Sequence, residues 1–324
     1  MRIRRTFLPL FIVLSLGIFP AFAAENHASL TLDPGPLPFK FVAYGDMRMT
    51  DSSNRHDSDP VRRKAIIGAI AQQQPKFVLI SGDLVLNGSN SSDWAEYDKE
   101  IKPITNAGAT IYPALGNHDA HGDLDTALNN YFQRFSQLDR SRYYSVKAGN
   151  VLIITLDSEE DDPNSPQRQW LDDVLDNRVS REIQFVVFCL HHPPYTNFTM
   201  MMVGHEARHQ EKDLAAYLEN RQKSSPAKFL VIGGHNHNYE RYEHNGIMYI
   251  VTGGGGATPY MPHRNPTDFY QGVGPTYHYC LITMEPGKLN FEMYKLTETL
   301  GRIGWEKADN FALTVENSQT RTSH

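Results

Sequence analysis

The chain has 324 residues, of which 40% are hydrophobic, and it carries a formal net charge of −6. This length allows one large domain with a well-buried core. The acidic balance argues against a nucleic acid as the main partner, because a polyanion is bound by a basic face.

The first 23 residues have the pattern of an export signal. Three arginines precede an apolar run at 7–19, and the small residues Ala21 and Ala23 are typical of a cleavage site. Arg4-Arg5 also resembles the twin-arginine signal, so export to the periplasm or the medium by that route or the general one is expected. An uncleaved tether is the alternative. Cleavage would leave a single domain at 24–324 with no membrane span and a charge of −9, since 28 basic residues then face 37 acidic ones.

After the signal, hydrophobic periodicity predicts strands that alternate with helices and then a strand-rich end. This order indicates a mixed sheet or two stacked sheets with flanking helices. Neither a repeat nor a linker divides the chain. We expect helices at 60–74, 123–135, 165–177 and 206–222, and strands at 39–44, 76–81, 110–115, 142–147, 150–156, 182–190, 228–232, 239–244, 247–252, 277–284 and 288–296.

Five of these strands are each followed by a loop that carries Asp, Asn or His. Ligands of open α/β sheets bind beyond the carboxyl ends of the strands, so we expect the five loops to converge. Any one loop alone could be a simple turn, but together they indicate a metal site, because imidazole and amide or carboxylate oxygens suit Fe, Zn or Mn. The loops are Gly45-Asp46, Gly82-Asp83, Gly116-Asn117-His118-Asp119, His191-His192 and Gly234-His235-Asn236-His237.

This series resembles the motifs of calcineurin-like metallophosphoesterases, and Gly234 to Arg241 is especially similar to the last motif of purple acid phosphatases. The resemblance implies an α/β (α+β) fold, a four-layer α/β/β/α sandwich of two stacked mixed sheets flanked by helices. It also implies two divalent or trivalent metal ions, of Fe, Mn or Zn. Asp83 would bridge them, with Asp46 and His237 holding the first and Asn117, His191 and His235 holding the second.

The resemblance further implies an exported hydrolase, a phosphatase or phosphodiesterase, that cleaves a small phosphorylated substrate by direct attack of a metal-bound hydroxide. His118 would contact the phosphate and protonate the leaving oxygen, and Asp119 would orient the His118 ring by a hydrogen bond. Arg48, His192 and Asn117 are further candidates for substrate contacts, although Arg48 and His192 could equally be structural. The rival is a non-catalytic metal- or phosphate-binding protein on the same scaffold.

The chain departs from the family pattern at the first metal. Relatives carry a histidine two residues after the first aspartate, or in purple acid phosphatases a tyrosine three residues after the second. Arg48 and Leu86 stand at these positions, and arginine has no lone pair for a cation. The sequence therefore predicts a weaker first site and no purple colour, with His56 or Asp51 as conceivable substitute ligands.

Several residues outside the motifs receive simpler interpretations. Tyr195, Tyr260 and Tyr270 either stack on a substrate ring or pack internally. Cys189 and Cys280 lie in apolar strands, which favours buried free thiols and leaves a disulfide open. We expect five histidines to be loop or surface residues: His121, His205, His209, His244 and His263.

Overall fold

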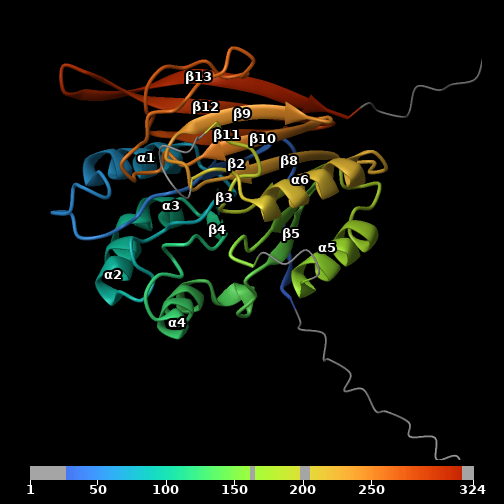
Figure 1. Ribbon diagram of the computed structural model, residues 1–324, viewed down its shortest axis with the longest axis horizontal. Helices are drawn as coiled ribbons and strands as arrows, with labels where there is room; N and C mark the ends of the chain where they lie inside the picture. The colour runs from blue at the N-terminus through green and yellow to red at the C-terminus, as the bar shows by residue number, and fades with distance from the viewer. Residues whose placement is uncertain (1–26, 161–164, 198–204, 316–324) are drawn as a thin grey trace, which may run out of the picture.

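The computed structural model describes residues 27–160, 165–197 and 205–315, so the predicted signal segment 1–23 lies outside them. Within these ranges two β-sheets stack face to face, and helices cover their outer faces (Figure 1). This is the four-layer arrangement that the resemblance implies, and the predicted fold class is confirmed.

The first sheet has seven strands, and its centre is parallel. Strand β6 pairs in parallel with β7, β7 with β8, and β8 with β10, while β5 and β6 form the predicted hairpin through a turn at Gly149. All residues of β6 and β7 are buried, because both faces of the sheet are covered. In spatial order the strands are β1 (Ser29–Leu32), β5 (Tyr144–Ala148), β6 (Val151–Thr155), β7 (Phe185–Cys189), β8 (Lys228–Gly233), β10 (Ile247–Thr252) and β9 (Tyr239–His244).

The second sheet has six strands, three of them parallel. Strands β2, β3 and β4 run in parallel, β11 pairs with β2 in the opposite direction, and β12 and β13 form a long hairpin at the far edge. In spatial order they are β13 (Arg302–Thr314), β12 (Lys288–Thr299), β11 (His278–Glu285), β2 (Phe39–Tyr44), β3 (Phe77–Ile80) and β4 (Thr110–Pro113).

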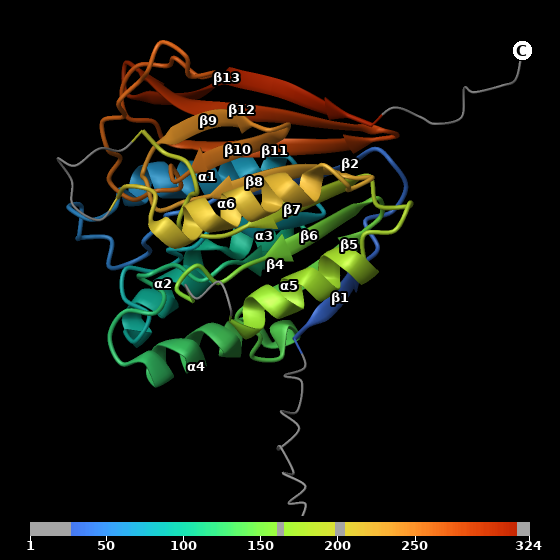
Figure 2. The same ribbon diagram turned by 45° about the vertical axis from the view of Figure 1, so that its right-hand side comes forward.

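Helices cover the two sheets with apolar faces. Helices α5 and α6 lie on the outer face of the seven-stranded sheet (Figure 2). Their buried residues Leu171 and Leu218 belong to the core on that face, and Ile66 and Ile70 of α1 belong to the core of the six-stranded sheet. None of the described helices combines the length and apolar character needed to cross a membrane. The helices are α1 (Pro60–Gln72), α2 (Ser91–Glu100), α3 (Lys102–Asn106), α4 (Leu124–Arg134), α5 (Pro166–Asn177), α6 (His209–Gln222) and the short 3-10 helix η1 (Ser136–Leu138).

The predicted helices and strands are all present, with ends shifted by a few residues. Elements that the sequence analysis missed are β1, α2, α3, β13 and the short 3-10 helix η1. Cys189 and Cys280 are both buried and free, so the open question of a disulfide is answered against it.

Candidate metal centre

The five predicted loops meet at one end of the sandwich. Strands β2, β3 and β4 of one sheet lead into the loops of Asp46, Asp83 and Asn117, and β7 and β8 of the other lead into those of His191 and His235. Both sheets therefore contribute side chains to the same site.

Close backbone packing holds the loops together. Asp46, Asp83 and His235 have φ values of 58, 55 and 68°, a left-handed conformation that costs of order 1 kcal/mol for a residue with a side chain. A Cβ atom on Gly82 would lie 2.5 Å from His191 Nδ1, so only glycine lets these two loops approach. Strained residues of this kind gather at functional sites.

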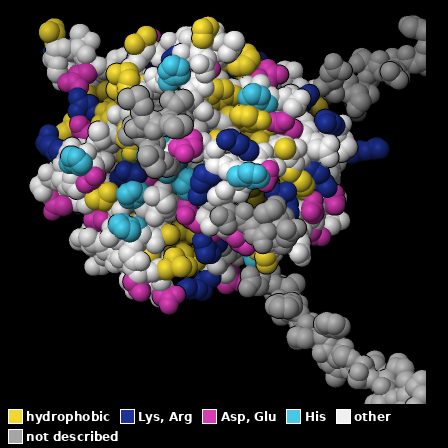
Figure 3. All heavy atoms as spheres, viewed as in Figure 1, with side chains coloured by type: hydrophobic (Ala, Val, Ile, Leu, Met, Phe, Trp, Pro, Cys, Tyr) yellow, Lys and Arg dark blue, Asp and Glu magenta, His cyan; other side chains and the backbone are white. Residues whose placement is uncertain are grey.

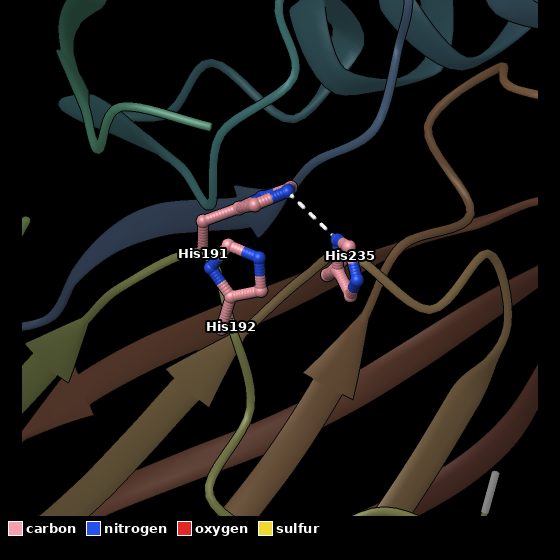
Figure 4. Close-up of side chains that lie close together, drawn as sticks. All are labelled: His191, His192 and His235. Atoms are coloured by element: carbon pink, nitrogen blue, oxygen red, sulfur yellow. Dashed lines mark hydrogen bonds between the residues drawn. The ribbon is translucent and has the colours of Figure 1, made fainter. Parts of the chain in front are cut away.

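The second site consists of His191, His235, Asn117 and one oxygen of Asp83. His191 Nδ1 lies 2.8 Å from Ser81 O and therefore carries the proton, which leaves a lone pair on Nε2. That Nε2 lies 3.0 Å from Asn117 Oδ1 and 3.3 Å from Asp83 Oδ1. His235 Nδ1 lies 3.2 Å from Asn117 Oδ1. It also lies 3.2 Å from His191 Nε2 (Figure 4).

These separations are those of ligands around a cation with bonds of about 2.0–2.1 Å. Burial lowers the pKa of His191, so its ring stays neutral. His191 Nε2 and the two oxygens are then all acceptors, which repel one another unless a cation lies between them. The donor set of the second site therefore fits a metal ion.

The first site consists of Asp46, His237 and the other oxygen of Asp83. His237 Nδ1 donates to Thr258 O at 2.7 Å, so its Nε2 bears the lone pair. This Nε2 is buried, has no hydrogen-bond partner among the described residues, and lies 3.6 Å from Asp46 Oδ1. Burial, followed by the charge of Arg48, keeps the pKa of His237 well below its usual value.

Arg48 occupies the remaining side of the first site. Its Nε donates to Asp83 Oδ2 at 3.2 Å, and its side chain is only 12% exposed. His56 and Asp51, the conceivable substitute ligands, are exposed, and His56 Nδ1 instead faces Asp57 at 3.2 Å. The described ligands of the first site are thus two carboxylates and one imidazole, next to a guanidinium.

Asp83 links the two sites. Its Oδ1 faces His191 and accepts the backbone N–H of His118 at 3.0 Å, while its Oδ2 faces Arg48. Burial would raise the pKa of Asp83, but the permanent charge of Arg48 and the backbone N–H of His118 lower it below its usual range. The carboxylate is therefore ionised, as a bridging ligand must be.

The family model for calcineurin-like phosphoesterases matches residues 39–239, which include every predicted metal ligand. The chain belongs to the calcineurin-like phosphoesterase family. This family binds two metal ions, and the groups of histidine and aspartate described above lie where the strand-end motifs predict them.

Three known proteins are similar to this chain. It is 25% identical over 254 residues to probable purple acid phosphatase 20 of Arabidopsis thaliana, covering 72% of this chain and 55% of that protein, so it spans about half of this relative's length. Purple acid phosphatase PPD1 from yellow lupin (Lupinus luteus) seeds has 18% identity and a TM-score of 0.65, over 87% of this chain and 55% of that one. GAP50, described as the anchor in the inner membrane complex of Plasmodium, has 16% identity and a TM-score of 0.62, over 87% and 90%. The two structures establish the fold.

In this family member, His118 lies at the partly exposed edge of the site. Its Nδ1 lies 2.7 Å from Leu86 O, which leaves Nε2 available for a ligand. The predicted hydrogen bond from Asp119 to the His118 ring is wrong. Asp119 instead accepts the backbone N–H groups of Leu84, Val85 and Gly116 and is fully buried, so a main-chain carbonyl orients the imidazole.

Two further histidines pack against His235. The rings of His192 and His205 lie 4.3 and 4.7 Å from its ring, and His192 Nδ1 lies 3.0 Å from Ser158 Oγ. His205 lies in a loop, as expected, but this loop, which precedes α6, places its ring against His235 in the site. No spacing in the sequence signals this, since His205 follows no strand.

The structure also shows the surroundings of the three tyrosines and of the remaining histidines. Tyr260 stacks on His237 with ring centroids 4.2 Å apart, so it forms a wall of the first site. Tyr195 stacks on His244 at 3.8 Å and Tyr270 packs on Tyr239 at 4.9 Å, both away from the metal ligands. Three histidines are exposed, as expected: His121, His209 and His263.

Proposed function

We propose that the chain is a metal-dependent hydrolase of phosphate esters. The observation that carries this proposal is the second site, where His191 Nε2, Asn117 Oδ1 and Asp83 Oδ1 meet as buried or half-buried acceptors at 3.0–3.3 Å. Nitrogen and oxygen ligands of this kind suit Fe, Mn or Zn. Such an ion would withdraw charge from a phosphoryl oxygen and lower the pKa of water.

His118 is the proposed general acid. Leu86 O holds its Nδ1, and the backbone N–H of His118 is held by Asp83 Oδ1, so the ring has a fixed place beside the second site. With Nδ1 as donor to the chain, Nε2 is the atom that would meet the phosphate and pass a proton to the leaving oxygen.

The residues around the centre support a small, anionic substrate. Arg48 can direct its remaining N–H groups at a phosphate, and Asn117 and His118 are partly exposed. The face drawn in Figure 3 mixes acidic and basic side chains with exposed histidines. We include in the proposal that the protein is exported, on the evidence of the signal pattern at 1–23.

Hydrolysis of p-nitrophenyl phosphate and of its bis ester, with Mn²⁺, Zn²⁺ or Fe²⁺ added, tests the activity and shows which ester is preferred. His118→Ala should lower kcat about 10²–10⁴-fold with unchanged unfolding by urea. His209→Ala, an exposed histidine on α6, is the matched control and should match the wild type. Absence of turnover with every metal would favour the non-catalytic binding protein.

A further inference from the structure

Arg48 is fixed at the first site by its backbone as well as its side chain. Its N–H and that of Met47 both donate to Asp83 O, at 2.9 and 3.0 Å, and its φ is 44°. The following residue, Met49, forms a β-bridge with Val85. The loop after β2 is thus tied to the loop after β3, which directs the arginine side chain towards the shared carboxylate.

The guanidinium uses the part of Asp83 that a first metal would need. Arg48 Nε lies 3.2 Å from Oδ2, while Oδ1 is turned to His191 in the second site. A bridging carboxylate offers one oxygen to each of two cations. In this chain Oδ1 of Asp83 faces the acceptor atoms of the second site, which need a cation between them. Oδ2 of Asp83 already faces a cation, the Arg48 guanidinium.

The remaining ligands of the first site are also partly engaged. Both oxygens of Asp46 accept the backbone N–H of His235, at 3.0 and 3.1 Å, and only His237 Nε2 is left without a partner among the described residues. A guanidinium has five N–H donors and no lone pair, so it repels a metal ion and cannot bind one.

We infer that Arg48 takes the place of the first metal ion, so that this phosphoesterase firmly binds one ion, in the second site, where most of its family binds two. This inference rests on the proposed metal-dependent function. The positive charge that an ion at the first site would supply comes instead from the Arg48 guanidinium, which is always protonated. Binding of any ion at the first site then requires that the guanidinium leave Asp83.

Metal content tests this directly. Elemental analysis after gel filtration of Mn²⁺-loaded protein should give one ion per wild-type chain and two per chain for Arg48→His. Titration should show a second equivalent bound at least 100-fold more weakly in the wild type than in the variant. Two Mn²⁺ ions about 3.5–4 Å apart couple magnetically, so the electron paramagnetic resonance spectrum of Arg48→His should show a coupled pair that the wild type lacks.

Two further variants keep the test decisive. Arg48→Gln removes the charge without adding a ligand and should strengthen the second equivalent at least tenfold, whether or not Arg48→His folds well. Arg55→His, at an exposed arginine in the same loop, should retain one ion. Two firmly bound ions in the wild type, or one in both Arg48 variants, would overturn the inference while leaving the proposed hydrolysis intact. One firmly bound ion without any turnover would overturn the proposed hydrolysis alone.

Discussion

Replacing Asp119 by asparagine tests whether this residue organises loops or takes part in catalysis. Its Oδ1 accepts the N–H groups of Leu84 and Val85 at 2.9 and 3.2 Å, and its Oδ2 accepts that of Gly116 at 3.0 Å. One buried carboxylate therefore joins the loop after β3 to the loop after β4. Asparagine has the same shape, but its amide nitrogen is a donor and would face the Gly116 N–H.

The expected loss of stability follows from these three bonds. A hydrogen bond to a charged group contributes about 1.5–3 kcal/mol and a neutral one about 1 kcal/mol, so the two bonds to Oδ1 weaken by about 1 kcal/mol each. Two unpaired buried donors at Gly116 add about 2 kcal/mol. Part of this loss is offset. Burial and the charge of Asp83 raise the pKa of Asp119, which means that the charged Asp119 carboxylate is disfavoured in the fold, and the asparagine variant buries no charge at this position. We expect Asp119→Asn to lower the free energy of unfolding by about 2–4 kcal/mol.

Urea unfolding followed by tryptophan fluorescence measures this difference. Asp125→Asn, the same change at an exposed aspartate in the first turn of α4, is the control and should leave stability within about 0.5 kcal/mol of the wild type. The reasoning would be refuted if Asp119→Asn were as stable as this control and yet lost as much activity as His118→Ala. That result would restore the catalytic role predicted from the sequence.

Other parts of the molecule give further expectations. Arg63 donates to the buried Glu100 carboxylate at 2.6 and 2.8 Å. Arg63→Met removes these two bonds and should lower the free energy of unfolding by about 3–5 kcal/mol. Burial alone would raise the pKa of Glu100, but hydrogen bonds from Arg63 and its charge lower it overall. The stability from this pair is therefore complete above the pKa of about 4.3 that Glu100 has in the unfolded chain, and it is lost as pH falls through the lower pKa of the folded state. In urea titrations repeated at falling pH, the difference in the free energy of unfolding between the wild type and Arg63→Met should therefore become smaller. Gly82→Ala places a Cβ 2.5 Å from His191 Nδ1, so calorimetry should show metal binding weakened at least tenfold. Gly108→Ala is the control, because Gly108 has a similar φ of 86° but open space around it. This variant has the same backbone strain without the clash and should bind metal normally. Removing metal with a chelator should lower the melting temperature, since an ion at 100 times its Kd contributes about 2.7 kcal/mol; an unchanged melting curve would count against a folded-state metal site.

Much of the fold could be predicted because buried strands leave a local pattern. Strands β6 and β7 are buried throughout and, except for Thr155, apolar, and they were expected at nearly the observed positions. The missed strand β13 is largely exposed, and its pairing with β12 depends on the rest of the sheet. Helix α2 buries Trp94 and Tyr97 but is otherwise polar, so its hydrophobic pattern is weak.

The metal ligands could be predicted because each follows a strand, and strand ends of a sandwich meet. The contacts of the residues beside these ligands could not be predicted from the sequence. The direction of the Arg48 side chain depends on the bridge between Met49 and Val85, and the partners of Asp119 are backbone amides from two other loops. Such contacts form only when the tertiary structure does, and His205 reached the site in the same way.

The division of ligands between the sheets affects how the protein acquires its metal. All the oxygen ligands, on Asp46, Asp83 and Asn117, follow strands of one layer, and all the imidazole ligands follow strands of the other. Neither layer by itself offers the mixed set that an ion such as Zn²⁺ or Fe²⁺ prefers. An ion of this kind would therefore bind after the two layers have docked, and its bonds to ligands from both layers would resist their separation.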